Sequence, residues 1–134
     1  MKTIRALLCT LLLLTISSLS FAAELVVIGH PSASPLSKDQ VADMYLGKTN
    51  SGTLYDLPEG SDLYASFYEQ ATGRNVSQVK STWARIVFSG QARAPSQLND
   101  SNAVRSAVAE NSSAIGYIEK SALDDSVKVL LELN

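Results

Sequence analysis

The fold is decided by residues 53–68, which read Thr53-Leu54-Tyr55-Asp56-Leu57-Pro58-Glu59-Gly60-Ser61-Asp62-Leu63-Tyr64-Ala65-Ser66-Phe67-Tyr68. This pattern predicts a short strand, a tight turn through Pro58 and Gly60, and a helix that begins at Ser61. Pro58 has no N–H to donate to a neighbouring strand, so it ends the strand. Gly60 permits the positive φ or the close backbone approach that a sharp reversal often needs.

A helix that begins at the end of a strand can bind an anion. Its first N–H groups have no partner within the helix, and they carry the positive end of the helix dipole. Ser61 would add a hydroxyl donor to such a site. The sequence alone favours the plainer interpretation, in which Ser61 is an N-cap that stabilises the helix by about 1 kcal/mol.

Residues 1–22 have the pattern of a secretory signal peptide. Lys2 and Arg5 form a basic start, an apolar stretch covers 6–16, and Ser20 and Ala22 are small residues placed for a signal peptidase. The apolar stretch is shorter than the roughly 20 residues that a membrane span needs. The sequence therefore predicts cleavage after Ala22 and a soluble, exported domain over 23–134.

The chain has one cysteine, Cys9, which lies inside the predicted signal peptide. Leu8 stands before it, where a lipoprotein signal has a small residue, so we expect no lipid anchor. The mature chain would then use neither disulfides nor thiolate chemistry.

Net charge limits the classes of partner. Without Lys2 and Arg5, 9 of the 11 basic residues remain against 13 acidic ones, a formal charge of −4. Such a mildly acidic surface argues against binding to nucleic acid and to anionic membranes. The mature length suits a single domain.

The remaining elements follow from hydrophobic periodicity, caps and glycines. An apolar run over 24–29 predicts a central strand buried on both faces. Helices are expected from a Ser37–Gln40 capping box to Gly47, from Asn75 or Ser77 to Gly90, and from Ser101 or Asn102 to Asn111. Residues 91–100 are expected to form a loop. Strands are expected at 114–118, with Gly116 at a close approach of backbone or ligand, and at 127–131, with Val127, Val129 and Leu131 alternating at the sheet edge.

Catalytic and metal-binding patterns are missing from the sequence. His30 is the one histidine, so no zinc site is expected. A Ser-His-Asp arrangement that uses His30 lacks any Gly-x-Ser-x-Gly turn, and no phosphate-binding Gly-x-x-x-x-Gly-Lys loop is present. We therefore expect neither an enzyme nor a bound cofactor.

Several fragments that together span nearly the whole mature chain share their order and spacing with a known family. They are Val26-Val27-Ile28-Gly29-His30-Pro31, residues 36–48 with Leu46-Gly47-Lys48 at the end, Glu59-Gly60-Ser61 followed by Phe67, Trp83 with Phe88-Ser89-Gly90, and Ala114-Ile115-Gly116-Tyr117-Ile118. In this order they resemble the small substrate-binding-protein-like domains of phosphate ABC transporters. The resemblance implies an α/β fold that forms a single lobe of a type II periplasmic binding protein, with a mixed sheet of about four to five strands and helices on both faces.

Two departures from the family concern the ligand. Full-length members carry an Arg-x-x-x-Ser-Gly-Thr turn that binds phosphate, and only its serine is kept here, at Ser61. Leu57 stands at the arginine position, so a strong charge-assisted contact is lost. The chain also matches one lobe, whereas tight binding uses two lobes that enclose the ligand.

Two functions remain open. The first is a periplasmic binding module for phosphate or a similar oxyanion, associated with uptake or sensing and working with an inner-membrane transporter, a porin or a sensor. The second is a ligand-free lobe that acts as an interaction module for an envelope partner or pairs with itself. The site residues expected for the first are Ser61, Asp62, Leu63 and Gly60, with His30 and Ser32 at the same sheet edge and Arg93 as a replacement cation.

Overall fold

The computed structural model describes residues 24–50 and 52–133. The predicted signal peptide, with Cys9 and the cleavage site after Ala22, lies outside the described residues. Over the described ranges, no helix is both long enough and apolar enough to cross a membrane.

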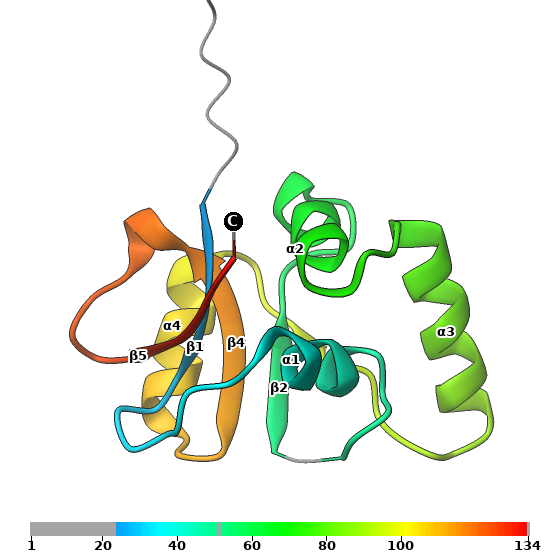
Figure 1. The fold of residues 1–134 in the computed structure, drawn as a ribbon, viewed down its shortest axis with the longest axis horizontal. Coiled ribbons are helices and arrows are strands. Elements are labelled where there is room, and N and C mark those ends of the chain that lie inside the picture. Colours follow the sequence, from blue (N-terminus) through cyan, green and yellow to red (C-terminus); the bar gives the residue numbers. More distant parts are fainter. Residues whose placement is uncertain (1–23, 51, 134) are drawn as a thin grey trace, which may run out of the picture.

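A mixed five-stranded sheet organises the chain (Figure 1). Its order is β3-β2-β4-β1-β5. β2 runs parallel to β3 and β4, whereas β1 runs antiparallel to β4 and β5. The strands are β1 (Leu25–Gly29), β2 (Thr53–Asp56), β3 (Ser96–Gln97), β4 (Ala114–Glu119) and β5 (Lys128–Leu133). The predicted α/β fold with a mixed sheet is confirmed.

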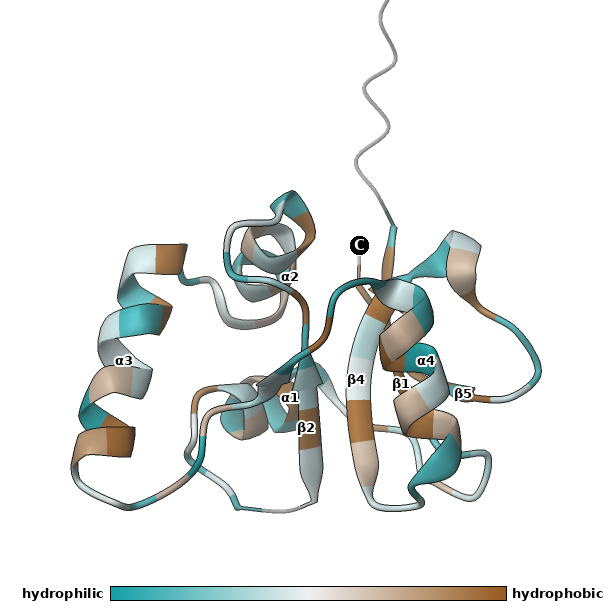
Figure 2. Cartoon of the chain, turned by 180° about the vertical axis from the view of Figure 1, so that it is seen from behind, coloured by the Kyte–Doolittle hydropathy of each residue, from teal (hydrophilic) through white to brown (hydrophobic). Residues whose placement is uncertain are grey.

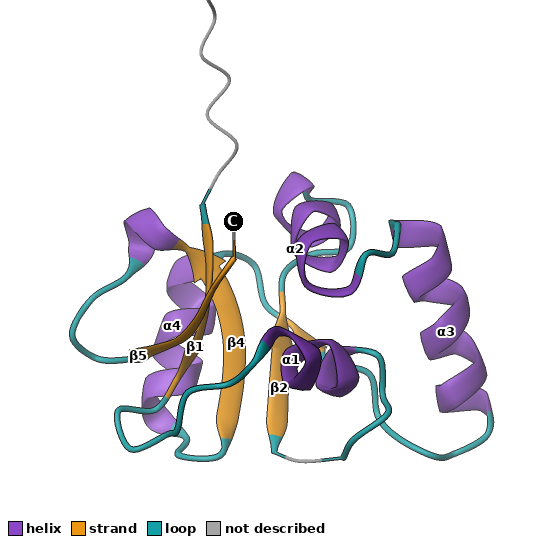
Figure 3. Ribbon diagram, in the orientation of Figure 1, coloured by secondary structure: helices purple, strands orange, loops and turns teal. Residues whose placement is uncertain are grey.

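Helices lie on both faces of the sheet, as the secondary-structure view in Figure 3 shows. α4 covers one face of β4, and α1 lies on the other side, while α3 packs against α2 at the end of the molecule. The helices are α1 (Lys38–Tyr45), α2 (Asp62–Thr72), α3 (Val76–Phe88) and α4 (Ser101–Glu110), with a short 3-10 turn, η1 (Lys120–Ala122), after β4.

The predicted helix ends are largely confirmed. Ser37 and Gln40 form a reciprocal capping box at the start of α1, and Gly47 follows its end with a φ of 74°. Of the two alternatives for α3, Asn75 is the cap, and its box partner is Gln78. The predicted start of α4 at Ser101 is confirmed, and Asp100 caps it.

β1 is buried at every residue, as its apolar run predicts. It is an interior strand between β4 and β5, and the middle position belongs to β4. The core beside these strands is rich in aromatic rings. Phe67 stacks on Tyr117 with the ring centroids 3.7 Å apart, and Tyr45 meets Phe67 edge-on at 4.8 Å. Such ring pairs stabilise a core beyond the area that they bury.

Three local expectations need correction. Residues 91–100 include the short strand β3, because Ser96 and Gln97 pair with the end of β2. In β5, Leu130 and Leu133 are buried and Val129 and Leu131 are only half-buried, and the register with β1 shifts between Val27 and Ile28. Gly116 gives room to side chains of α4: a Cβ there would lie 2.5 Å from a methyl group of Val104.

Candidate functional site

The turn between β2 and α2 forms as the sequence predicts. Ser61 has extended backbone angles, and its N–H donates to the carbonyl of Pro58 at 2.9 Å. Its Oγ donates to the same carbonyl at 2.7 Å and accepts the N–H of Tyr64 at 3.2 Å. Ser61 is therefore an N-cap, and its hydroxyl hydrogen is engaged within the turn.

The first two amides of α2 remain available. Among the residues that the structure describes, none accepts a hydrogen bond from the N–H of Asp62 or Leu63. α2 has 11 residues, enough for a developed helix dipole. The amides that were expected to bind an anion are thus neither capped by side chains nor paired within the helix.

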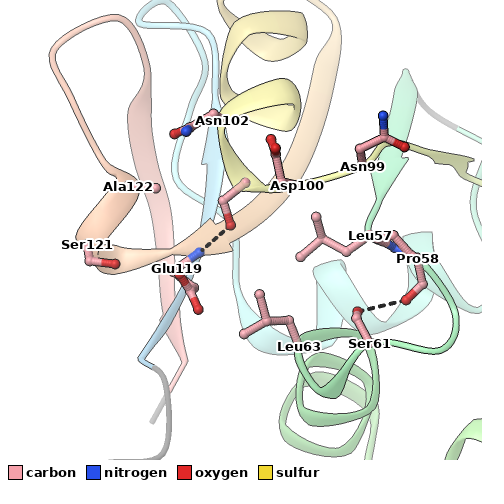
Figure 4. A pocket seen from close by; sticks show the side chains of 11 residues that line it. Leu57, Pro58, Ser61, Leu63, Asn99, Asp100, Asn102, Glu119, Ser121 and Ala122 are labelled. Atoms are coloured by element: carbon pink, nitrogen blue, oxygen red, sulfur yellow. Dashed lines mark hydrogen bonds between the residues drawn. The ribbon is translucent and has the colours of Figure 1, made fainter.

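A pocket of about 380 Å³ lies where the start of α2 faces the start of α4 (Figure 4). The end of β4 and the turn η1 close its far side. It is lined by Leu57, Pro58, Ser61, Leu63, Asn99, Asp100, Ser101, Asn102, Glu119, Ser121 and Ala122. Two helix N-termini therefore meet at one cavity, which we call the α2–α4 pocket.

The polar groups of this pocket are only partly engaged. Asp100 Oδ1 accepts the N–H of Ala103 at 2.8 Å, so Asp100 caps α4. Ser101 is buried, and its Oγ accepts the N–H of Glu119 at 3.2 Å, which leaves its hydroxyl hydrogen free to donate. The charged lining residues are Asp100 and Glu119, and no cation lines the pocket among the described residues. The helix dipoles attract an anion, whereas the two carboxylates repel it.

Of the seven predicted site residues, Ser61 and Leu63 line the α2–α4 pocket. Asp62 is exposed beside it. Gly60 has no positive φ, and a Cβ there would meet no atom within 4 Å, so the turn itself does not require glycine at this position.

His30 and Ser32 follow the carboxyl end of β1, which lies at the opposite end of the strands from Ser61. The expectation that these residues lie at the same strand ends as Ser61 is therefore wrong. Ile115 near the start of β4 pairs with Gly29 at the end of β1 and also with Leu54 near the start of β2. Because β1 runs antiparallel to β4, the carboxyl end of β1 and that of β2 point in opposite directions. His30 Nδ1 instead bonds Ser32 Oγ at 2.7 Å within an exposed turn.

Arg93 does not converge on Ser61 either. It is exposed, and it lines a different groove, beside α3. The proposed replacement cation is therefore absent from the α2–α4 pocket.

Sequence reasoning missed a buried polar network on the other side of the same turn. Asp56 is 2% exposed, and its carboxylate accepts hydrogen bonds from the hydroxyls of Tyr68, at 2.6 Å, and Tyr117, and from the N–H of Leu57 at 2.9 Å. Burial raises the pKa of Asp56 to about 6, although the three hydrogen bonds act in the opposite direction. The one available signal was an acidic residue between apolar strand residues and Pro58.

Asp56 also lines a small cavity of about 180 Å³, together with Glu59, Tyr64, Trp83 and Lys80. Lys80 and Glu59 form an ion pair of 2.8 Å at this cavity. No group of three or more histidine, cysteine or acidic side chains is placed to hold a metal ion within the described ranges.

Comparison with solved structures relates this geometry to known proteins. An ABC-type phosphate transport receptor from Vibrio cholerae matches 81% of the chain with a TM-score of 0.63 and 20% identity. The chain has the fold of one lobe of such a receptor. A putative phosphate ABC transporter substrate-binding protein from Clostridium perfringens, solved with bound phosphate, also matches 81% of the chain, with a TM-score of 0.62 and 23% identity.

The matched region corresponds to less than half the length of each of these two proteins. The chain spans 45% of the Vibrio receptor and 44% of the Clostridium protein. No model of a known protein family matches the sequence. The predicted single-lobe fold is confirmed, and the ligand has to be argued from the pocket itself.

Proposed function

We propose that this chain is an exported solute-binding lobe that takes a small oxyanion, such as phosphate, in the α2–α4 pocket. The observation that carries the proposal is the meeting of two helix N-termini at one cavity, where the N–H groups of Asp62 and Leu63 have no acceptor among the described residues. Helix N-termini bind oxyanions through such amides and through the helix dipole. The Ser101 hydroxyl supplies a further donor.

The carboxylates that line this pocket favour a ligand of low negative charge. Asp100 and Glu119 line the pocket, and no lysine or arginine does so in the part of the chain that the structure describes. A singly charged oxyanion is repelled less than a doubly charged one, so affinity for phosphate should be weak and should rise as the pH falls toward its monoanionic form.

Calorimetry against phosphate and sulfate tests this proposal. Glu119→Gln removes one repelling charge and should tighten phosphate binding about three- to tenfold. Glu110→Gln is the matched control, because it makes the same charge change at the opposite end of α4. Absence of binding heat up to millimolar phosphate in both the wild type and Glu119→Gln contradicts the proposal.

A second candidate function is an interaction lobe without a ligand of its own. One observation favours it: no cation lines the pocket among the residues that the structure describes. A partner from the cell envelope, or a second copy of the chain, would then contact the face of the lobe that carries the pocket. Uptake and sensing are both compatible with either candidate.

A further inference from the structure

The segment 70–99, which includes α3 and the loop after it, has a charge distribution unlike the rest of the protein. It contains Arg74, Lys80, Arg85 and Arg93 and no acidic residue, whereas all 13 acidic residues of the chain lie elsewhere. The net charge of the whole chain does not reveal this contrast. The segment therefore carries a net positive charge, although Glu59 from outside the segment pairs with Lys80.

The apolar surface of the protein is concentrated on the same segment. In the part of the chain that the structure describes, the exposed large hydrophobic residues are Phe88, at 95% exposed, and Val87, at 51%. They are neighbours in the last turn of α3, which Figure 2 colours as hydrophobic. Val87 also lines a cavity, which places exposed apolar surface at the rim of that cavity.

The cavity beside them is a groove of about 870 Å³ between α3, the end of α1 and the start of β2. Met44, Leu54, Trp83 and Val87 provide apolar walls, and the charged residue of the lining is Arg93. The lining combines these apolar walls with polar side chains, and small-molecule sites likewise combine apolar walls with a few polar groups.

The loop that carries Arg93 is fixed at both ends. Gln91 N–H donates to the carbonyl of Ile86 at 3.2 Å, and Leu98 N–H donates to the carbonyl of Asp56 at 2.9 Å. Ser96 also pairs with Tyr55 of β2. The backbone holds Arg93 over the groove, and within the described ranges its guanidinium forms neither an ion pair nor a hydrogen bond.

We propose that this groove binds a small amphipathic organic anion, with its apolar body between Trp83 and Met44 and its acidic group on Arg93. The site is separate from the α2–α4 pocket and does not depend on oxyanion binding there. Arginine suits this role because it stays charged and can bind a carboxylate or sulfonate with two parallel hydrogen bonds.

Trp83 is the only tryptophan of the chain and lines the groove, so its fluorescence detects a probe that binds nearby, and the Arg93 variant locates that probe. Titration with 8-anilinonaphthalene-1-sulfonate should give energy transfer from Trp83. Octanoate should displace this probe, and octylammonium should displace it at least tenfold more weakly. Arg93→Gln should weaken probe binding about tenfold, and Val87→Asp should weaken it as well.

Arg74→Gln is the matched control, since it makes the same charge change outside the groove and should leave probe binding unchanged. Thermal unfolding checks that each variant is folded. Three results overturn the proposal: no energy transfer at millimolar probe, equal binding by wild type and Arg93→Gln, or equal displacement by octanoate and octylammonium. A fourth result also overturns it: the protein sediments with phosphatidylglycerol vesicles, and octanoate fails to displace the probe. That result would indicate a membrane-binding surface.

Discussion

Tyr117 of β4 donates its hydroxyl hydrogen to the carboxylate of Asp56 at the end of β2, 61 residues earlier in the chain. The same ring stacks on Phe67 of α2. One side chain thus joins the central strand to both elements that form the β2–α2 turn. The turn that presents Ser61 is held by this contact as well as by its own local hydrogen bonds.

Tyr117→Phe should lower the free energy of unfolding by about 1–3 kcal/mol, because it leaves the buried carboxylate of Asp56 with one hydrogen-bond donor fewer. Urea denaturation measures the loss. Tyr55→Phe is the control, since the Tyr55 hydroxyl takes part in no hydrogen bond with a residue that the structure describes. Equal stability of the two variants contradicts a structural role for the network.

Asp56 should make stability depend on pH. Its pKa in the folded protein is raised to about 6 from 3.8, so the folded state holds this proton more tightly than the unfolded state. Its contribution is therefore most favourable below about pH 4 and falls as the pH rises to about 6, by up to about 3 kcal/mol. Urea denaturation from pH 4 to 8 of the wild type and Asp56→Asn isolates this contribution, and parallel curves would contradict it.

Gly116→Ala should destabilise the protein by about 1–3 kcal/mol, because the added methyl group would lie 2.5 Å from Val104 and 3.2 Å from Val108. Gly60→Ala is the matched control, since nothing lies within 4 Å of a Cβ there and its φ is not positive. We expect Gly60→Ala to be neutral or slightly stabilising. A cost at Gly60 equal to that at Gly116 would show that close packing is not the cause.

Two substitutions of Ser61 separate its capping role from ligand binding. Ser61→Ala should cost about 1 kcal/mol of stability through loss of the cap to Tyr64. Ser61→Asp keeps an acceptor for the N–H of Tyr64 but loses the hydrogen bond to the Pro58 carbonyl, so it should be no more stable than the wild type, and it adds a negative charge to the α2–α4 pocket. Calorimetry should then show weaker phosphate binding in Ser61→Asp than in Ser61→Ala, at a temperature where both variants are folded. Unchanged affinity would mean that phosphate binds elsewhere.

Local signals in the sequence predicted most of the elements and their ends. Pro58 ended β2, Ser61 capped α2, and Ser37 with Gln40 began α1, because capping and strand termination depend on a few consecutive residues. The edge strand β5 was also found from its apolar residues, but its buried position shifted to Leu130. A register shift against β1 depends on the partner strand, which a single segment does not specify.

The sequence by itself determined the order of the elements other than β3 and η1, the strand end at Pro58 and the helix cap at Ser61. Only the tertiary structure decided which residues meet. Because β1 runs antiparallel to β4, His30 and Ser32 lie at the opposite end of the strands from Ser61. The fixed loop after α3 placed Arg93 at a separate groove. Strand direction and loop path follow from pairings between distant segments, and these pairings also buried Asp56 beside Tyr117.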